Sequence, residues 1–321
     1  MAMGKTTVIP PKNVNATNDC NFFMNTTTTF ANYGNRLKLT SLWILIASVL
    51  VGLMVSKALA TPAPSSEAYN SAANVIPEQY TYRILQTRDH STKSFTQGLA
   101  LYQGDLIESS GLYGRSFVSR YHPTHSKPVQ KKRLNRRLFA EGVALFNDTL
   151  YLLTWKRGVV LQLNPNTLEP RGQLSYQGEG WGLARYEQQL LMSDGSNQLS
   201  LRSPQDFSIE RQLSVSKMGQ PLHKLNDLTV IPASPNSPAR IWANVWHHSS
   251  LYAIDPNTGT VEAQLDLSAL ANKHSRGHPD NVLNGIVWDQ ARQGLWVTGK
   301  RWPKRYLIEL IAPHSPSPEE H

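Results

Sequence analysis

A single charged residue, Glu141, interrupts the apolar stretch FAEGVAL, which runs from Phe139 to Leu145. A carboxylate in an apolar strand is costly unless hydrogen bonds or a charged partner stabilise it. In a partly dry pocket, burial would raise the pKa of such a carboxyl group, whereas a neighbouring lysine would lower it. Glu141 is therefore the first candidate for proton-transfer chemistry, and its behaviour depends on the partners that the fold brings to it.

Five short segments of the chain, including the one with Glu141, resemble one another. They are TQGLA (96–100), AEGVA (140–144), GWGLA (180–184), LNDLT (225–229) and LNGIV (283–287). Their second residues are Gln97, Glu141, Trp181, Asn226 and Asn284. A second strand follows each segment, and these strands end at Gly111, Trp155, Gly195, Trp246 and Lys300. If the five segments are equivalent in the fold, then carboxamides, indoles and a lysine gather around one carboxylate at the rim of a pocket.

The five segments recur at the spacing of a structural repeat. Their third residues are at positions 98, 142, 182, 227 and 285, so the intervals range from 40 to 58 residues. Repeats of about 40 to 45 residues, each with about four short strands, are typical of β-propeller blades. The sequence therefore predicts an all-β, five-bladed β-propeller whose inner strands line a central channel.

The strand TYRILQT (81–87) precedes the first repeat and is expected to complete the last blade and close the ring, which removes exposed sheet edges. A β-sandwich is the alternative arrangement, but the similarity between successive units argues against it. Helical signals are scarce, and SALANK (268–273) is expected to form at most a short turn.

The composition limits the classes of partner. The chain of 321 residues has one cysteine, Cys20, so no disulfide can form within it. Its 32 Lys and Arg exceed its 23 Asp and Glu, and much of this excess lies in KPVQKKRLNRR (127–137). We interpret this cluster as a solvated loop, with binding to an anionic surface as the alternative. No nucleic-acid partner is predicted, because no nucleic-acid motif accompanies the charge.

The histidines do not show the pattern of a metal site. The pairs that are close in sequence are His122 and His125, His247 and His248, and His274 and His278. No three of them fall at equivalent positions of the ring, where a zinc site would need them. The sequence therefore predicts neither a metal nor another cofactor.

The longest apolar run, LWILIASVLVGLMVS (42–56), follows Arg36 and Lys38 and precedes Ala-Leu-Ala at 58–60. A positive flank, an apolar run and a small-residue site are typical of a secretory signal peptide. The run is short for a membrane span, which needs about 20 residues. Cleavage after Ala60 and an uncleaved anchor within 42–60 are the two alternatives, and both place the later residues outside the cytoplasm, either periplasmic or secreted.

These patterns predict four regions. They are a tail with a signal peptide or anchor (1–60), a linker (61–79), the propeller domain (80–311) and a flexible C-terminal tail (312–321). The propeller is expected to be a monomer.

Nine motifs follow one another in order over roughly residues 80–311. They are SFTQGLAL (94–101), ESSGLYGRS (108–116), FAEGVAL (139–145), LTWK (153–156), GEGWGL (178–183), SDGS (193–196), ANVW (243–246), LNGIVWD (283–289) and VTGKRWP (297–303). In this order they resemble the plant and bacterial type of glutaminyl-peptide cyclotransferase, or glutaminyl cyclase. The resemblance implies a five-bladed propeller that converts the N-terminal glutamine of a peptide or protein to pyroglutamate, releasing ammonia without a metal.

The resemblance also implies the roles of individual residues. The acid/base glutamate of the family corresponds to Glu141. The aromatic pocket corresponds to Phe95, Trp155, Trp181 and Trp246, and the polar substrate contacts correspond to Gln97, Asn226 and Lys300.

In the mechanism that we expect, Glu141 carries a proton from the attacking α-amine to the leaving nitrogen. Lys300, together with Gln97 or Asn226, stabilises the charge that develops on the carbonyl oxygen. Glu179, next to Gly180 and Trp181, is the alternative proton carrier.

One motif departs from the family pattern. Where the family commonly reads LNELE, this chain has LNDLT (225–229), so Asp227 is one methylene shorter and Thr229 replaces a carboxylate. If the family's acid at position 227 or 229 supports the ring of pocket residues, the pocket geometry and the turnover of this chain are altered. One alternative is therefore a family member that has lost activity. The other alternative is a non-catalytic propeller that binds peptide ends or sugars at the same aromatic mouth.

Overall fold

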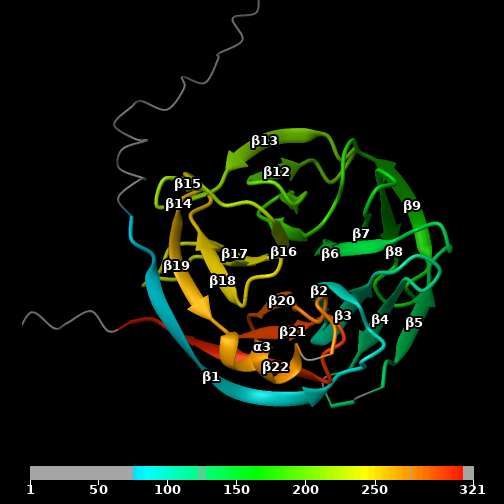
Figure 1. Ribbon diagram of the computed structural model, residues 1–321. Helices are drawn as coiled ribbons and strands as arrows, with labels where there is room; N and C mark the ends of the chain where they lie inside the picture. Colours follow the sequence, from blue (N-terminus) through cyan, green and yellow to red (C-terminus); the bar gives the residue numbers. More distant parts are fainter. Residues whose placement is uncertain (1–74, 123, 126, 276, 314–321) are drawn as a thin grey trace, which may run out of the picture. The chain divides into compact units, whose positions relative to one another are not determined.

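The computed structural model describes residues 75–313 apart from 123, 126 and 276, and strands dominate the regular structure of these residues. Three antiparallel sheets are each built from four consecutive strands (Figure 1). The first sheet contains β2 (Thr96–Tyr102), β3 (Asp105–Ser110), β4 (Phe117–Tyr121) and β5 (Gln130–Arg133). The second contains β6 (Ala140–Phe146), β7 (Thr149–Thr154), β8 (Val159–Leu163) and β9 (Pro170–Ser175). The third contains β10 (Leu183–Tyr186), β11 (Gln189–Ser193), β12 (Gln198–Arg202) and β13 (Ile209–Ser214). The all-β class predicted from the sequence is confirmed.

The remaining long strands form one sheet in the order β16-β17-β18-β19-β1-β22-β21-β20. Its strands are β16 (Leu225–Ile231), β17 (Arg240–Val245), β18 (Ser250–Ile254), β19 (Val261–Asp266), β1 (Glu78–Asp89), β22 (Lys304–Ile311), β21 (Gly294–Gly299) and β20 (Leu283–Asp289). β1 begins parallel to β19 and then runs antiparallel to β22, from Thr81 opposite Ile311 to Asp89 opposite Lys304. The N-terminal strand expected at 81–87 therefore lies within β1 and pairs with the last strand of the chain (Figure 1).

The first strand of each repeat contacts the first strand of the next. β2, β6, β10, β16 and β20 are neighbours in this order, and β20 is again a neighbour of β2. Hydrogen bonds join them near their N-terminal ends: the backbone N–H of Gly142 donates to the Trp181 carbonyl at 2.6 Å. Likewise, Asn284 Nδ2 donates to the Thr96 carbonyl at 3.0 Å. The fold thus brings together the strand ends that carry the aligned residues.

Apolar layers between neighbouring sheets hold the units together. In one of them, Leu191 and Leu199 pack with Ile241 and Ala243 of the following repeat, and all four side chains are buried. Burial of such side chains is the main favourable term in folding. The inner strands therefore bury apolar residues against neighbouring strands. Their ends are not filled by this packing and can carry the residues of a site.

Glycine is required where the inner strands approach one another. A Cβ added to Gly182 would lie 1.9 Å from the Asn226 carbonyl oxygen, and one added to Gly142 would lie 2.4 Å from the Leu183 nitrogen. Both obstacles are backbone atoms, which cannot move aside without separating the strands. Close contact between the inner strands therefore explains why Gly142 and Gly182 stand at the third position of their repeats.

We expect Gly182→Ala to destabilise the protein by about 1–3 kcal/mol or more, because the new methyl group overpacks the contact between β10 and β16. Urea unfolding followed by tryptophan fluorescence measures this. The matched control is Gly172→Ala on the outer strand β9, where the new Cβ meets only the flexible Gln162 side chain. Equal loss of stability in the two variants would contradict the steric explanation.

Three local expectations need correction. Residues 268–274 form a helix, α3 (Ser268–His274), rather than a turn, because Leu270 and Ala271 have good helix propensity and pack into the core. The basic cluster is not simply a loop, since residues 130–133 form β5 at the edge of the first sheet, where exposed lysines oppose edge-to-edge association. The third inner strand begins at Leu183, later than the aligned GWGLA, since Trp181 and Gly182 bond outside the ladder.

Two further strands, β14 (Ser216–Lys217) and β15 (Gln220–Pro221), form a small hairpin between the third sheet and β16. The signal peptide or anchor expected within residues 1–60 lies outside the described residues. Among residues that are described, no helix is long and apolar enough to cross a membrane.

Candidate active site

A pocket of about 320 Å³ lies at the ends of the inner strands. Its lining includes all eight residues selected from the sequence, namely Phe95, Gln97, Glu141, Trp155, Trp181, Asn226, Trp246 and Lys300. Leu112, Phe139 and Asp280 complete the lining. Residues separated by up to 205 positions in the chain are neighbours here because equivalent strand ends of successive repeats meet.

Glu141 is almost completely buried, with 5% of its surface exposed, so it lies deep in the pocket and not at the rim that the sequence suggested. One carboxylate oxygen accepts a hydrogen bond from Gln97 Nε2 at 3.0 Å. Burial raises the pKa of Glu141 well above its ordinary value, although the charge of Lys300 and the Gln97 hydrogen bond act in the opposite direction. The structure thus indicates a raised pKa for Glu141, a direction that the sequence left open.

Lys300 is also buried, with 5% exposed, and its ammonium group lies 4.7 Å from the centre of the Phe95 ring. Burial lowers the pKa of Lys300, and the carboxylates of Glu141 and Asp280 partly counteract this. Among the described residues, the lysine has no ion pair within 4 Å. Its charge is therefore directed into the pocket, where it can meet a developing anion.

Aromatic rings form the wall of the pocket. Phe139 contacts Phe95 and Trp155 with ring-centre distances of 6.3 and 5.4 Å, and Trp181 meets Trp246 edge to face at 5.8 Å. Phe139 also covers Gly111, where a Cβ would lie 2.2 Å from the ring. The ring of Trp181 covers Gly195 in the same way, at 2.6 Å. Glycine therefore stands at two strand ends because an aromatic ring occupies the space of a side chain.

Glu179 has a supporting function in this wall. Its Oε2 accepts hydrogen bonds from Trp155 Nε1 at 2.7 Å and from Trp181 Nε1 at 3.1 Å, and Lys156 lies 3.3 Å from the other oxygen. Although partial burial alone would raise its pKa, these donors lower the pKa of Glu179 below its ordinary value. An ionised carboxylate that fixes two indoles is a poor proton carrier, so the structure favours Glu141 over Glu179.

Gln97 and Asn226 offer acceptor atoms to the pocket. Both residues are 3% exposed, and Gln97 Oε1 and Asn226 Oδ1 accept no hydrogen bond within the part of the chain that is described. Asn284, at the equivalent position, instead donates to the carbonyls of Thr96 and Gln97 and does not line the pocket. Four of the five aligned positions therefore line the pocket, and the fifth, Asn284, joins two strands instead.

Three lining residues were missed in the sequence. Phe139 precedes Glu141 by two positions, just as Phe95 precedes Gln97, so the alignment itself contained the signal. Leu112 directly follows the strand end at Gly111. Asp280, by contrast, lies in a turn outside the repeat, and nothing in the sequence places this turn over the pocket.

The departure from the family pattern at 225–229 lies beneath the pocket. Asp227 is fully buried and its Oδ2 accepts a hydrogen bond from the backbone N–H of Ile286 at 2.7 Å. Thr229 Oγ1 accepts from the backbone N–H of Trp288 at 2.9 Å. Both residues therefore join β16 to β20, and the shorter Asp and the neutral Thr still perform this connection.

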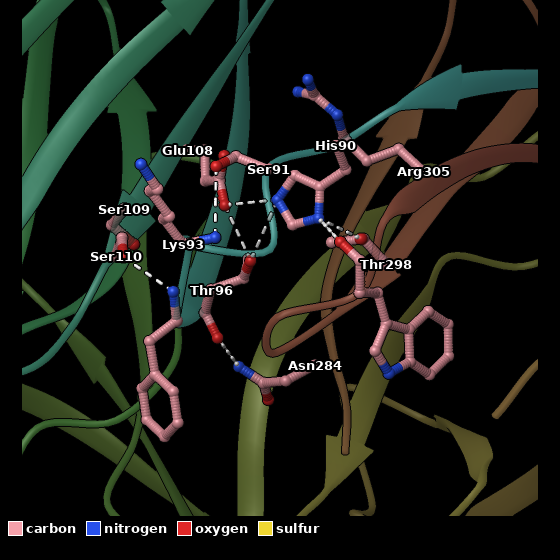
Figure 2. A network of polar contacts seen from close by, with 12 residues as sticks. His90, Ser91, Lys93, Thr96, Glu108, Ser109, Ser110, Asn284, Thr298 and Arg305 are labelled. Atoms are coloured by element: carbon pink, nitrogen blue, oxygen red, sulfur yellow. Dashed lines mark hydrogen bonds and ion pairs between the residues drawn. The ribbon is translucent and has the colours of Figure 1, made fainter. Parts of the chain in front are cut away.

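A buried histidine–glutamate pair holds the segment that follows Lys300. His90 Nε2 lies 2.8 Å from Glu108 Oε1, and the side chains of both residues are fully buried. The other ring nitrogen donates to the Trp302 carbonyl at 2.6 Å, and the His90 backbone N–H donates to Pro303. Figure 2 shows the imidazole between Glu108 and Thr298. This pair connects the end of β1 and β3 to residues 302–303, directly after Lys300.

Glu108 remains ionised despite its burial. Burial alone would raise its pKa, but the charge and hydrogen bond of His90, with Arg305 and Thr96, lower the pKa of Glu108 to about 2. Thr96 Oγ1 donates to the same oxygen at 2.7 Å. Glu108 is thus a structural carboxylate, held by hydrogen bonds with His90 and Thr96.

The residues described show no cluster of three or more histidine, cysteine, aspartate or glutamate side chains arranged to hold a metal ion. The polar groups at the pocket are one carboxyl group deep inside, a second at its edge, one ammonium group and two carboxamides. This set can transfer a proton and stabilise an anion next to an aromatic wall.

The chain was compared with known proteins. A family model described as glutamine cyclotransferase matches residues 53–310. The glutaminyl-peptide cyclotransferase of Arabidopsis thaliana is 34% identical over 227 residues, which cover 69% of this chain and 68% of the relative. The crystal structure of Myxococcus xanthus glutaminyl cyclase superposes with a TM-score of 0.68 at 32% identity, covering 74% of this chain and 100% of that one. The chain therefore belongs to the glutamine cyclotransferase family.

Proposed function

We propose that the pocket around Glu141 converts the N-terminal glutamine of peptides and proteins to pyroglutamate and releases ammonia. Family membership and both relatives support this glutaminyl-peptide cyclotransferase activity. The observation that carries the assignment to this pocket is the buried Glu141 carboxyl, hydrogen-bonded by Gln97 and enclosed with Lys300 by aromatic rings.

The reaction joins the α-amine nitrogen to the γ-carboxamide carbon and breaks the bond to the amide nitrogen. An α-amine has a pKa of about 7.7–8.0, so a sizeable neutral fraction is ready to attack near neutral pH. The aromatic wall holds the glutaminyl chain folded back on its amine, and such control of geometry supplies several kcal/mol. Glu141 accepts the proton that the amine loses and delivers it to the departing nitrogen, which leaves as ammonia.

Lys300 stabilises the oxyanion of the tetrahedral intermediate, because its ammonium group is buried and free of an ion pair among the described residues. One of the two N–H groups of Gln97 is held by Glu141, and its oxygen, like that of Asn226, has no donor among the described residues and is suited to accept N–H groups of the substrate. Gln97 is therefore proposed as an acceptor for the substrate and not as a stabiliser of the oxyanion.

The test is incubation of the full chain with a peptide that begins with glutamine. We expect stoichiometric ammonia release and a mass decrease of one NH₃ per peptide. Binding of the peptide without ammonia release would instead support a non-catalytic binding protein or a family member that has lost activity.

Lys300→Met is expected to shift the acid limb of the pH profile of kcat to higher pH. The ammonium charge lowers the pKa of Glu141, so its removal raises that pKa further. The basic carboxylate form is present above the pKa and lost below it, so the variant needs a higher pH. We also expect kcat at the optimum to fall by about 10²–10³-fold.

Lys300→Arg, which retains the charge, is the control for this shift and should keep the acid limb near its original pH. An unchanged acid limb in Lys300→Met would show that the lysine does not act on the carboxyl group.

We infer further that the four-stranded units are the blades of a five-bladed β-propeller closed by β1. The neighbour order of the inner strands and the pairing of β1 with β22 support this arrangement. We also propose that the domain acts as a monomer outside the cytoplasm, secreted, periplasmic or anchored through residues 42–60. Fractionation of the host cells with detection of the mature N-terminus tests the location.

A further inference from the structure

The mouth of the pocket carries cations that the proposed reaction does not use. We define the mouth cations as Lys224 and Arg301, each adjacent in space to a residue of the pocket wall. Lys224 Nζ lies 5.9 Å from the centre of the Trp246 ring, and the Arg301 guanidinium lies 4.7 Å from the centre of the Phe95 ring. The His247 ring lies beside them, tilted against Trp246 with a ring-centre distance of 4.4 Å.

The backbone at these positions argues that the side chains are needed. Lys224, His247 and Arg301 have left-handed φ values of 65°, 66° and 60°. Glycine would be the favoured residue in this conformation, and strained residues with side chains are concentrated at functional sites. Leu112, with φ of 96°, is a fourth such residue at the pocket. Three of these four residues have a basic side chain.

Hydrogen bonds fix the backbone at Lys224 and Arg301. The Lys224 N–H donates to the Gly195 carbonyl at 2.8 Å, and the Lys224 carbonyl accepts from the Trp246 N–H at 2.9 Å. The Arg301 N–H donates to the Ser94 carbonyl at 2.7 Å. These positions are therefore held next to the aromatic wall and are not the tips of mobile loops.

The positive charge at the mouth is not neutralised by neighbouring acids. Within the described residues, neither Lys224 nor Arg301 forms an ion pair within 4 Å; the Arg301 guanidinium donates a hydrogen bond to Asn281 Oδ1 at 3.4 Å. Glu179 is occupied by Lys156 and two indoles. Asp280 acts on Lys300 and lies 3.7 Å from His278.

We propose that the mouth cations select substrates with acidic residues directly after the N-terminal glutamine. This inference rests on the proposed function, since the glutaminyl side chain must occupy the pocket for the following residues to leave past the mouth. Each further residue advances an extended chain by at most about 3.3–3.6 Å, so the second and third side chains lie within reach of a lysine or arginine at the rim. Charge complementarity of this kind determines specificity and association rate.

The experiment compares three amidated pentapeptides, Gln-Glu-Glu-Ala-Ala, Gln-Ala-Ala-Ala-Ala and Gln-Lys-Lys-Ala-Ala, on the full chain. We expect kcat/KM to decrease in this order, with the acidic peptide about 10-fold above the basic one at low salt. The ratio should approach one at high salt, because exposed charges are then screened.

The double variant Lys224→Glu/Arg301→Glu should invert the ratio between acidic and basic peptides. The replacements keep a side chain at both left-handed positions, so they add no new backbone strain. The control Arg171→Glu/Arg185→Glu makes the same change of charge at exposed positions that do not line the pocket, and it should leave the ratio unchanged.

Quenching of pocket tryptophan fluorescence gives the affinity for each peptide independently of catalysis. A ratio near one in the unmodified protein, or a ratio that the mouth variant does not change, would overturn the proposed selection. Absence of ammonia from every peptide would contradict the proposed function alone, while the affinities would still decide whether the mouth prefers acidic chains.

Discussion

Glu141→Gln is expected to lower kcat by about 10²–10⁴-fold while peptide binding is retained. The amide has nearly the same shape as the carboxyl group and still fits beside Gln97, but it cannot take up the proton of the attacking amine. Ammonia release under saturating peptide measures kcat, and tryptophan quenching measures binding. An unchanged kcat would remove Glu141 from the mechanism.

The same variant should be more stable than the original protein near neutral pH. The folded-state pKa of Glu141 is raised, so the folded protein holds this proton more tightly than the unfolded chain does. The resulting contribution is fully favourable below the unfolded pKa of about 4.3 and is lost as the pH rises through the folded value. A neutral amide avoids this loss, so thermal unfolding at pH 7 should occur at a higher temperature and at pH 4 at a similar one.

Glu179→Gln is the matched control for catalysis. This glutamate is the alternative proton carrier from the sequence, but its Oε2 is engaged by the indoles of Trp155 and Trp181. An amide oxygen can still accept from both indoles but loses the charge that faces Lys156, so we expect a change in KM and less than about a tenfold loss in kcat. A larger loss of kcat than in Glu141→Gln would exchange the two assignments.

His90→Ala is expected to destabilise the protein by about 3–5 kcal/mol, because it leaves the buried Glu108 carboxylate without its hydrogen-bonding partner. The loss should also lower kcat, since the same histidine fixes residues 302–303 next to Lys300. Chemical unfolding and ammonia release measure the two effects. His248→Ala is the control: its Nδ1 hydrogen-bonds with the Tyr252 hydroxyl at 2.9 Å, and we expect a loss of stability of about 1 kcal/mol.

The double variant His90→Ala/Glu108→Ala separates the ion pair from simple loss of packing. If the unpaired charge causes the damage, the double variant loses less stability than the sum of the single variants. The pH dependence gives an independent check. The pKa of Glu108 is lowered to about 2, so its contribution is present above the unfolded value of about 4.3 and disappears as the pH falls toward 2. Additive losses would contradict the pairing.

The sequence by itself determined which strands are equivalent and, through this, which side chains meet. Gln97, Glu141, Trp181 and Asn226 occupy the same position of successive repeats, so the contacts between successive inner strands bring them to one pocket. The spacing of small residues was informative for the same reason, because the inner strands touch through Gly142 and Gly182. A repeated sequence encodes equivalent places in a fold.

Only the tertiary structure decided the interactions between parts of the chain that do not repeat. His90 and Asp280 lie outside the aligned segments, so no register placed one beside Glu108 and the other beside Lys300. The sign of the Glu141 pKa shift was undetermined for a related reason. It depends on the balance between burial and the distances to charges, and these distances are set by loops whose conformation depends on packing and not on any repeated pattern.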